Sequence, residues 1–133
     1  MKPITSFKIL AGVMFLIFSL SGCYYDEPPP PAEIDPELVS FSGHIVPIFD
    51  KACNNPGCHS SVEGDPVPDL TAENAYDELL GGGYVNLTIS ESSILYLRIT
   101  GTSAGPLMPP GSKLSPTDIE LVLAWIEKGA LND

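Results

Sequence analysis

Two cysteines and a histidine lie close together in the segment 53–59, which reads CNNPGCH. Two thiols followed directly by an imidazole are the groups needed to attach a haem through thioether bonds and to ligate its iron. The usual attachment motif has two residues between the cysteines, whereas four residues separate Cys53 from Cys58. The Asn-Pro-Gly run before Cys58 suits the bulge that this spacing requires, because Asn and Gly tolerate positive φ and Pro presets a turn. We therefore expect Cys53 and Cys58 to bind haem and His59 to ligate the iron.

A haem that transfers electrons needs an axial base on each face of its iron, because a closed coordination shell changes little between the two redox states. Met108 is the one methionine downstream of residue 22, and two prolines follow it directly. A thioether ligand stabilises ferrous iron and raises the reduction potential. The sequence therefore predicts His59 and Met108 as the metal ligands of one covalently attached haem c, with no catalytic residue.

Other interpretations of these residues stay open at the level of the sequence. His44 is a second candidate imidazole ligand, which would give a bis-histidine haem of lower potential. Cys53 and Cys58 could instead form a disulfide, as is common in small exported domains. Without haem, His59 and Met108 could carry copper, which accepts imidazole and thioether ligands. With haem, an open sixth position would indicate a haem peroxidase or the haem subunit of a larger oxidoreductase.

The N-terminus predicts export and lipid attachment. Lys2 and Lys8 precede an apolar run over residues 9–20, which is too short to span a bilayer comfortably but suits the core of a secretory signal. The run ends in the letters LSGC, which resemble the lipobox of bacterial lipoproteins. Removal of residues 1–22 as a lipoprotein signal peptide and acylation of Cys23 would also account for the odd number of cysteines. The alternative is an ordinary signal peptide that is cleaved elsewhere and leaves Cys23 as a free thiol.

The mature chain is strongly acidic. Removal of Lys2 and Lys8 with the signal peptide leaves 4 of the 6 basic residues against 17 acidic ones, and thus a formal charge of −13. This balance makes nucleic acid an implausible partner and favours redox partner proteins with basic docking faces. Residues 23–40 combine acidic side chains with four consecutive prolines, a composition that stays extended. We expect them to form a tether between the acylated cysteine and the folded domain.

Lipid attachment would place the protein in the bacterial cell envelope. The acyl chains on Cys23 bury many methylene groups, each worth about 0.8 kcal/mol, and so provide a membrane anchor. Tyr24 follows Cys23, whereas an aspartate at this position often accompanies retention in the inner membrane. We therefore expect the outer membrane, facing the periplasm or the cell surface.

Residues 41–133 are expected to form one small all-α domain of about four helices. Apolar residues recur at helical spacing in segment 43–51 and again from residue 71 to a run of three glycines that begins at residue 81. Segment 94–99 is apolar enough for a strand or a helix, but the Ser and Glu residues before it favour a helix.

The last predicted helix has the clearest signals. Ser115 is suited to the N-cap, Pro116 to the first helical position, and Gly129 stands just beyond the end. A helix this apolar in so small a domain must pack deeply, against the first helix and a bulky ligand. Its apolar stripe consists of Ile119, Val122, Leu123 and Ile126, widened by Leu121 and Trp125.

Several motifs together resemble the class I cytochrome c domains of bacterial envelope proteins, in particular the planctomycete-type cytochrome c module. The resemblance covers most of residues 41–130, and its departure from the family is the spacing within the haem motif. The motifs are VPIF at 46–49, the segment 93–99, MPP at 108–110, LS at 114–115 and WIEKGA at 125–130.

The resemblance implies a small cytochrome c-like fold in which the terminal helices cross beside a covalently bound haem. It places Phe49 and Trp125 in the positions of an aromatic pair near this crossing. It also implies that a carbonyl of a proline-containing loop accepts the second N–H of the proximal histidine, and Pro68 is the candidate acceptor for His59. Arg98 is, in addition, a candidate partner of a haem propionate, since arginine pairs readily with carboxylates.

These features together predict a lipid-anchored, monohaem c-type cytochrome. Its expected role is to carry single electrons in the bacterial cell envelope as an electron-transfer protein, not as an enzyme.

Overall fold

All regular structure in the described part of the computed structural model, residues 33–102 and 105–133, is helical. The all-α class predicted from the sequence is therefore confirmed for this part of the chain. The expected signal peptide, Cys23 and the first part of the expected tether lie outside the described residues. None of the described helices has the length and apolar character needed to cross a membrane.

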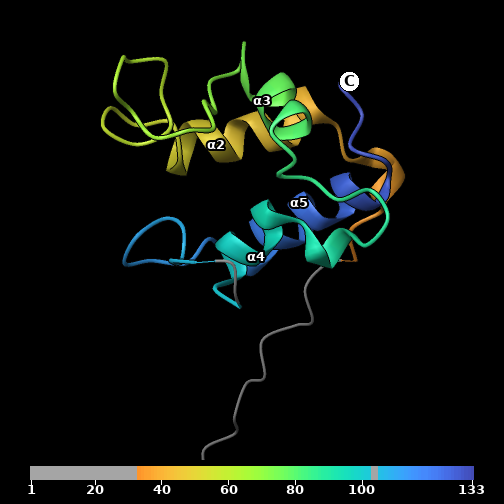
Figure 1. The fold of residues 1–133 in the computed structure, drawn as a ribbon. Coiled ribbons are helices and arrows are strands. Elements are labelled where there is room, and N and C mark those ends of the chain that lie inside the picture. The colour runs from red at the N-terminus through yellow and green to blue at the C-terminus, as the bar shows by residue number, and fades with distance from the viewer. Residues whose placement is uncertain (1–32, 103–104) are drawn as a thin grey trace, which may run out of the picture. The chain divides into compact units, whose positions relative to one another are not determined.

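Figure 1 shows α2 and α3 on one side of the domain and α4 and α5 on the other. The long loops that follow α2 and α4 project from the same end of the domain. In chain order the elements are the 3₁₀ turn η1 (Pro36–Leu38), the π-helical turn η2 (Phe41–Ile45), α2 (Val46–Ala52), α3 (Ala75–Gly81), the 3₁₀ turn η3 (Ser90–Ser92), α4 (Ile94–Thr100) and α5 (Pro116–Glu127).

The turn η2 and helix α2 form one helical segment where the sequence predicted a helix over 43–51. Ser40 caps the start of this segment, since its hydroxyl accepts a hydrogen bond of 3.2 Å from the N–H of Gly43. Pro47 lies in the first turn of α2, directly after the π-helical turn η2. The predicted apolar face is buried through Ile45, Ile48 and Phe49.

Helix α3 begins at Ala75, later than Thr71, the predicted start. The intervening residues form turns, and the Asp69 carboxylate accepts from the N–H of Thr71 at 2.9 Å and from its hydroxyl at 2.7 Å. Such a side-chain turn competes with regular helix. Helix α4 resolves the strand-or-helix ambiguity in favour of the helix, with Leu95 and Ile99 buried.

Helix α5 confirms the strongest local signals in the sequence. The hydroxyl of Ser115 accepts from the N–H of Asp118 at 3.1 Å, and Pro116 is the first helical residue. Gly129 lies just beyond the helix with φ +107°, a conformation that favours glycine. These caps fix the length of the helix that carries the largest buried side chain of the described residues, Trp125.

Packing begins upstream of residue 41, the expected start of the domain. Val39 is buried and Ile34 packs against the core, with η1 between them. Lys128 at the end of α5 donates to the carbonyl of Val39 at 2.8 Å and to the carboxylate of Asp133 at 2.7 Å. The composition of residues 23–40 predicted an extended tether, because acidic residues and prolines outnumber the apolar residues in this segment. The last part of it instead packs against the domain.

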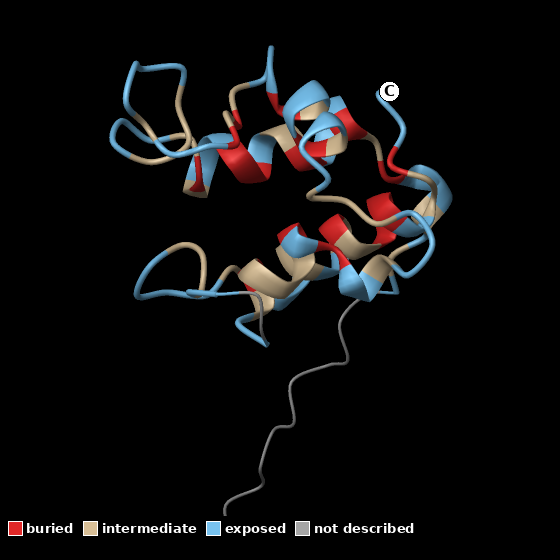
Figure 2. Cartoon of the chain, viewed as in Figure 1, coloured by how far each residue is buried: buried red, intermediate tan, exposed pale blue. Residues whose placement is uncertain are grey.

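The ring of Phe41 connects the aromatic side chains of the core. Its centroid lies 5.2 Å from that of Trp125, 6.5 Å from that of Phe49 and 5.5 Å from that of Tyr76. The resemblance implied a pair of Phe49 with Trp125, and the structure places Phe41 against both rings. Trp125 is fully buried, and its indole N–H donates to the carbonyl of Leu131 at 2.9 Å. Figure 2 shows buried residues on the inward sides of α2, α3 and α5.

Replacing Trp125 should destabilise the domain strongly. We expect Trp125→Ala to lower the free energy of unfolding by about 3–5 kcal/mol, because it empties a large buried volume. Trp125→Phe keeps a ring but loses the indole hydrogen bond, and we expect a loss of about 1–2 kcal/mol. Urea denaturation measures both values. A loss below about 1 kcal/mol for Trp125→Ala would contradict the central place of this side chain.

Candidate functional site

The segment CNNPGCH leaves the end of α2 as a closed loop. The N–H of Cys53 donates to the carbonyl of Phe49 at 2.8 Å and so continues the last helical turn, while the carbonyl of Cys53 accepts from the N–H of His59 at 3.1 Å. Gly57 has φ +85°, which is the conformational freedom that the Asn-Pro-Gly run was expected to provide. The longer spacing between the cysteines is thus accommodated by a bulge.

The carboxylate of Asp65 holds this bulge from the far side of the loop. One of its oxygens accepts from the N–H of Gly57 at 3.2 Å and from the hydroxyl of Ser60. The N–H of Asp65 donates to the carbonyl of Val62 at 3.0 Å, which closes the turn that carries the carboxylate. The conformation of the cysteine loop therefore depends on an acidic residue outside the motif.

The imidazole of His59 is fixed by the loop that follows it. Its Nδ1 lies 2.8 Å from the carbonyl oxygen of Pro68, the acceptor that the resemblance implied. A carbonyl can only accept, so Nδ1 carries the proton, and Nε2 presents a lone pair. The N–H of Leu70 also donates to the carbonyl of His59 at 2.9 Å, so ring and backbone are held by the same segment.

A polar cluster around Asp69 stabilises the segment just after Pro68. The carboxylate accepts from the backbone and hydroxyl of Thr71, from the hydroxyl of Ser61 at 2.8 Å and from the amide of Asn74 at 2.8 Å. Desolvation raises the pKa of Asp69, but the hydrogen bonds, led by those from Thr71, outweigh it and lower the pKa from 3.8 to about 2. The ionised carboxylate therefore organises this turn.

Met108 reaches the same region from the loop between α4 and α5. Its N–H donates to the carbonyl of Arg98, in α4, at 2.9 Å. The guanidinium of Arg98 donates to the carbonyl of Pro106 at 3.2 Å. Two hydrogen bonds to one residue of α4 therefore hold the chain on both sides of Leu107.

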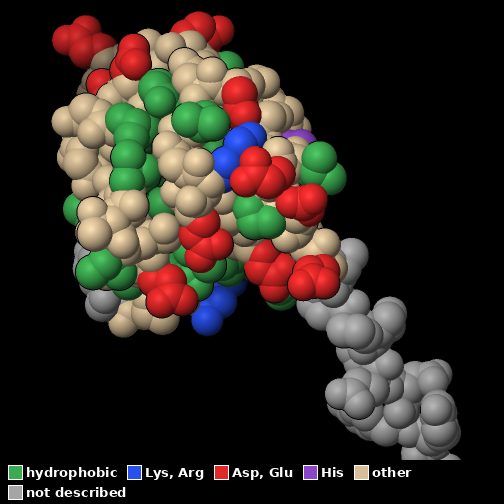
Figure 3. Space-filling model, turned by 90° about the vertical axis from the view of Figure 1, so that its right-hand side faces the viewer, with side chains coloured by type: hydrophobic (Ala, Val, Ile, Leu, Met, Phe, Trp, Pro, Cys, Tyr) green, Lys and Arg blue, Asp and Glu red, His purple; other side chains and the backbone are tan. Residues whose placement is uncertain are grey.

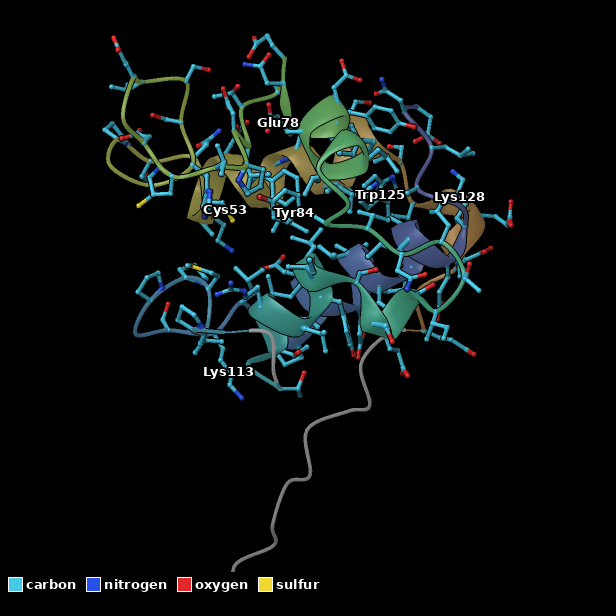
Figure 4. All side chains as sticks on the ribbon, in the orientation of Figure 1. Cys53, Glu78, Tyr84, Lys113, Trp125 and Lys128 are labelled. Carbon is cyan, nitrogen blue, oxygen red and sulfur yellow. The ribbon has the colours of Figure 1, made fainter. Side chains whose placement is uncertain are left out.

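A groove brings the predicted site residues together. It consists of two adjoining hollows of about 150 and 130 Å³, and both are lined by Cys53, His59, Pro66 and Met108. Cys58 lines the smaller hollow. In Figure 4, Cys53 lies at the end of α2 on the side that faces the loop after α4. Aliphatic walls are supplied to the larger hollow by Leu70, Leu79, Leu95 and Ile99.

The two thiols of the groove differ in their surroundings. Cys53 is buried, whereas Cys58 is half-buried, and both are free cysteines in the structure. Burial, and secondly the negative charge of a Cys58 thiolate, raise the pKa of Cys53 from 9.0 to about 11. Cys53 is therefore a neutral thiol at neutral pH, unlike the thiolate that acts as nucleophile in thiol–disulfide exchange.

Other candidate residues are placed outside the groove or against it. His44 is exposed on η2, and its Nδ1 accepts from the N–H of Ser40 at 3.1 Å, so the structure does not bring the second imidazole to the site. Arg98 lines the larger hollow, as a propionate partner would. Sequence reasoning missed Tyr84, which also lines this hollow. Its only signal was an aromatic residue after the glycines that end α3.

Comparison of the chain with protein-family models, with curated proteins and with solved structures found no match. Within residues 33–102 and 105–133 there is also no group of three or more His, Cys, Asp or Glu side chains that could bind a metal ion together. The function of the chain is therefore inferred from its own residues and their geometry.

Neutralising Asp69 should change the acid sensitivity of the domain. The folded-state pKa of Asp69 lies below its ordinary value, so its ionised form stabilises the fold above about pH 4, and this contribution is lost as the pH falls through about 2. We expect Asp69→Asn to be less stable than the parent at pH 6, with the difference shrinking between pH 4 and pH 2. Thermal unfolding across this range measures it.

Glu63→Gln is the matched control, because it removes an exposed negative charge from the same loop. It should leave the pH dependence of unfolding unchanged. Equal curves for Asp69→Asn and the parent would show that the polar cluster does not stabilise the turn.

Proposed function

We propose that this chain is a monohaem c-type cytochrome that carries single electrons in the bacterial cell envelope. The observation that supports this most directly is the meeting of Cys53, His59 and Met108 on the lining of one apolar groove, although Met108 stands in a loop remote in sequence. Cys58 lines the adjoining hollow beside the same residues. The proposed arrangement is a cytochrome c-like fold within the all-α class.

The donors and the walls of the groove fit a haem. The walls of the larger hollow are mainly aliphatic, as the apolar faces of a porphyrin require. His59 presents Nε2 because Nδ1 is bound to Pro68. Each thiol can add across one vinyl group, with the sulfur bonding to one carbon and the thiol hydrogen passing to the other. These residues would hold the porphyrin by two thioether bonds and one nitrogen.

The surroundings of the donors suit electron transfer better than substrate turnover. A bound haem would supply the reversible ferric–ferrous couple. His59 is kept in one tautomer and one orientation by Pro68, which also makes its ligating nitrogen more basic. Met108 would supply the second iron ligand, and the aliphatic walls would exclude water. A ligand set held by backbone contacts needs little rearrangement between the two redox states.

We further propose that acylated Cys23 anchors the domain through an acidic, proline-rich tether. Support comes from the sequence, namely the apolar run over 9–20 and the letters LSGC that end in Cys23. The proposed location is the outer membrane, facing the periplasm or the cell surface. A tethered domain can sample partners in the envelope without dissociating from the membrane.

The proposed partners are redox proteins with basic docking faces. Figure 3 shows carboxylates spread over the face that is turned away from the two long loops, with few basic side chains among them. The chain as a whole has 17 acidic and 6 basic residues. Such a charge balance accelerates encounter with a positively charged surface, more strongly at low salt.

Optical spectra of the protein made in a host with haem-attachment machinery test the proposed ligands. The parent should show sharp α and β bands when reduced and a sulfur-to-iron band when oxidised. Met108→Ala should abolish the sulfur-to-iron band and lower the reduction potential while the haem stays covalently bound. Leu107→Ala, in the same loop, is the control and should keep the band.

Each other result identifies a different kind of protein. A high-spin spectrum in the parent would favour a haem peroxidase, in which a small ligand binds at an open position. A band that persists in Met108→Ala would remove Met108 from the iron. The absence of a Soret band would eliminate both haem interpretations and leave the disulfide or copper-binding lipoprotein.

A further inference from the structure

The segment that carries Met108 is hydrogen-bonded to Arg98 of α4. It lies in the methionine loop, residues 101–115, of which 103 and 104 lie outside the described residues. At the start of this loop the N–H groups of Gly101 and Thr102 donate to the carbonyl of Leu97 in α4, and further along the N–H of Met108 donates to the carbonyl of Arg98 at 2.9 Å. The side chain of the same Arg98 adds the bond of 3.2 Å to the carbonyl of Pro106. One arginine therefore holds the loop with both its backbone and its side chain.

The packing of Gly105 shows how closely the guanidinium lies against the loop. A Cβ at this position would come within 2.5 Å of Nη1 and 2.6 Å of Cζ of Arg98. The backbone of Gly105 also has φ +115°, where residues other than glycine are strained. Glycine thus allows the guanidinium to lie directly over the chain and reach the Pro106 carbonyl.

We propose that Arg98 is a positioning residue that keeps Met108 directed at the iron by tying Pro106 to α4. This inference rests on the proposed haem site. A thioether is a weak ligand for iron. The entropy cost of ordering its loop when the bond forms therefore takes a large share of the binding free energy. A loop already held by Arg98 loses less freedom, and an external ligand must then break this tie to displace Met108.

The alternative role for Arg98 is electrostatic, because its side chain also lines the larger hollow. An arginine that only neutralises a propionate would change the reduction potential without acting through Met108. The two roles are separated by measuring how easily Met108 is displaced, both in the parent and after Met108 has been removed.

The experiment is a titration of the oxidised, haem-loaded protein with imidazole, followed by the loss of the sulfur-to-iron band. We expect imidazole to bind Arg98→Gln about tenfold more tightly than the parent, which corresponds to about 1.4 kcal/mol. Arg98→Lys should fall between them, since an ammonium can donate to Pro106 but lacks the planar fork. Lys113→Gln removes a positive charge from the same loop and should leave the affinity unchanged.

A second background and a second variant make the test specific. In Met108→Ala, where there is no thioether to displace, adding Arg98→Gln should not change the affinity for imidazole, which is followed there by the shift of the Soret band. Gly105→Ala should reproduce the effect of Arg98→Gln with the arginine still present, because the added methyl displaces the guanidinium.

The outcomes separate the two proposals. Equal imidazole affinity in haem-loaded Arg98→Gln, Gly105→Ala and the parent would overturn the role of Arg98 and leave the cytochrome intact. An effect of Arg98→Gln that persists in Met108→Ala would also overturn it, in favour of a propionate contact. Failure of the parent itself to bind haem covalently would overturn both proposals.

Discussion

The hydrogen bond from Nδ1 of His59 to the carbonyl of Pro68, at 2.8 Å, is the interaction on which the site depends. It fixes the proton on Nδ1, leaves Nε2 free to ligate, and joins the cysteine loop to the segment that follows it, while His59 lines the groove. Two carboxylates support it from either side. Asp65 holds the bulge between the cysteines, and Asp69 holds the turn after Pro68. The imidazole is thus held by hydrogen-bonded loops and not by a helix.

The helices determine where this loop meets the methionine loop. Phe41, Phe49 and Trp125 join the first helical segment to α5, and Lys128 joins the end of α5 to the residues before η2. Helix α4 then presents Arg98, to which the methionine loop is bound. The loops after α2 and α4 are therefore attached to one packed frame and project from the same end of it, as Figure 1 shows. A groove of this kind can gather donors from distant parts of a short chain.

Much of this frame could be predicted from local sequence. Residue types at fixed spacing predicted the caps of α5, the apolar face of α2 and the bulge at Gly57. A family resemblance predicted the Pro68 carbonyl as the acceptor for His59. The contacts of Asp65, Asp69 and Arg98 could not be predicted in the same way. The chain has 17 acidic residues, and only the tertiary fold decides which carboxylates lie next to a free N–H or hydroxyl. The packing of Ile34 against the core could not be predicted for a similar reason. The few apolar residues in this segment stand among prolines and acidic residues, and only the folded structure shows that they lie next to the core.

A haem bound covalently through Cys53 and Cys58 would add to the intact mass of the mature protein, which mass spectrometry measures. The protein should be purified from a host with haem-attachment machinery, beside a variant with both cysteines changed to serine. We expect the mass of the parent to exceed that of its acylated polypeptide by one haem, which remains bound after acidic organic extraction. The serine variant should have only the mass of its acylated polypeptide. A parent that is colourless and has only the mass of the acylated polypeptide, or two hydrogens less because of a disulfide, would contradict this expectation.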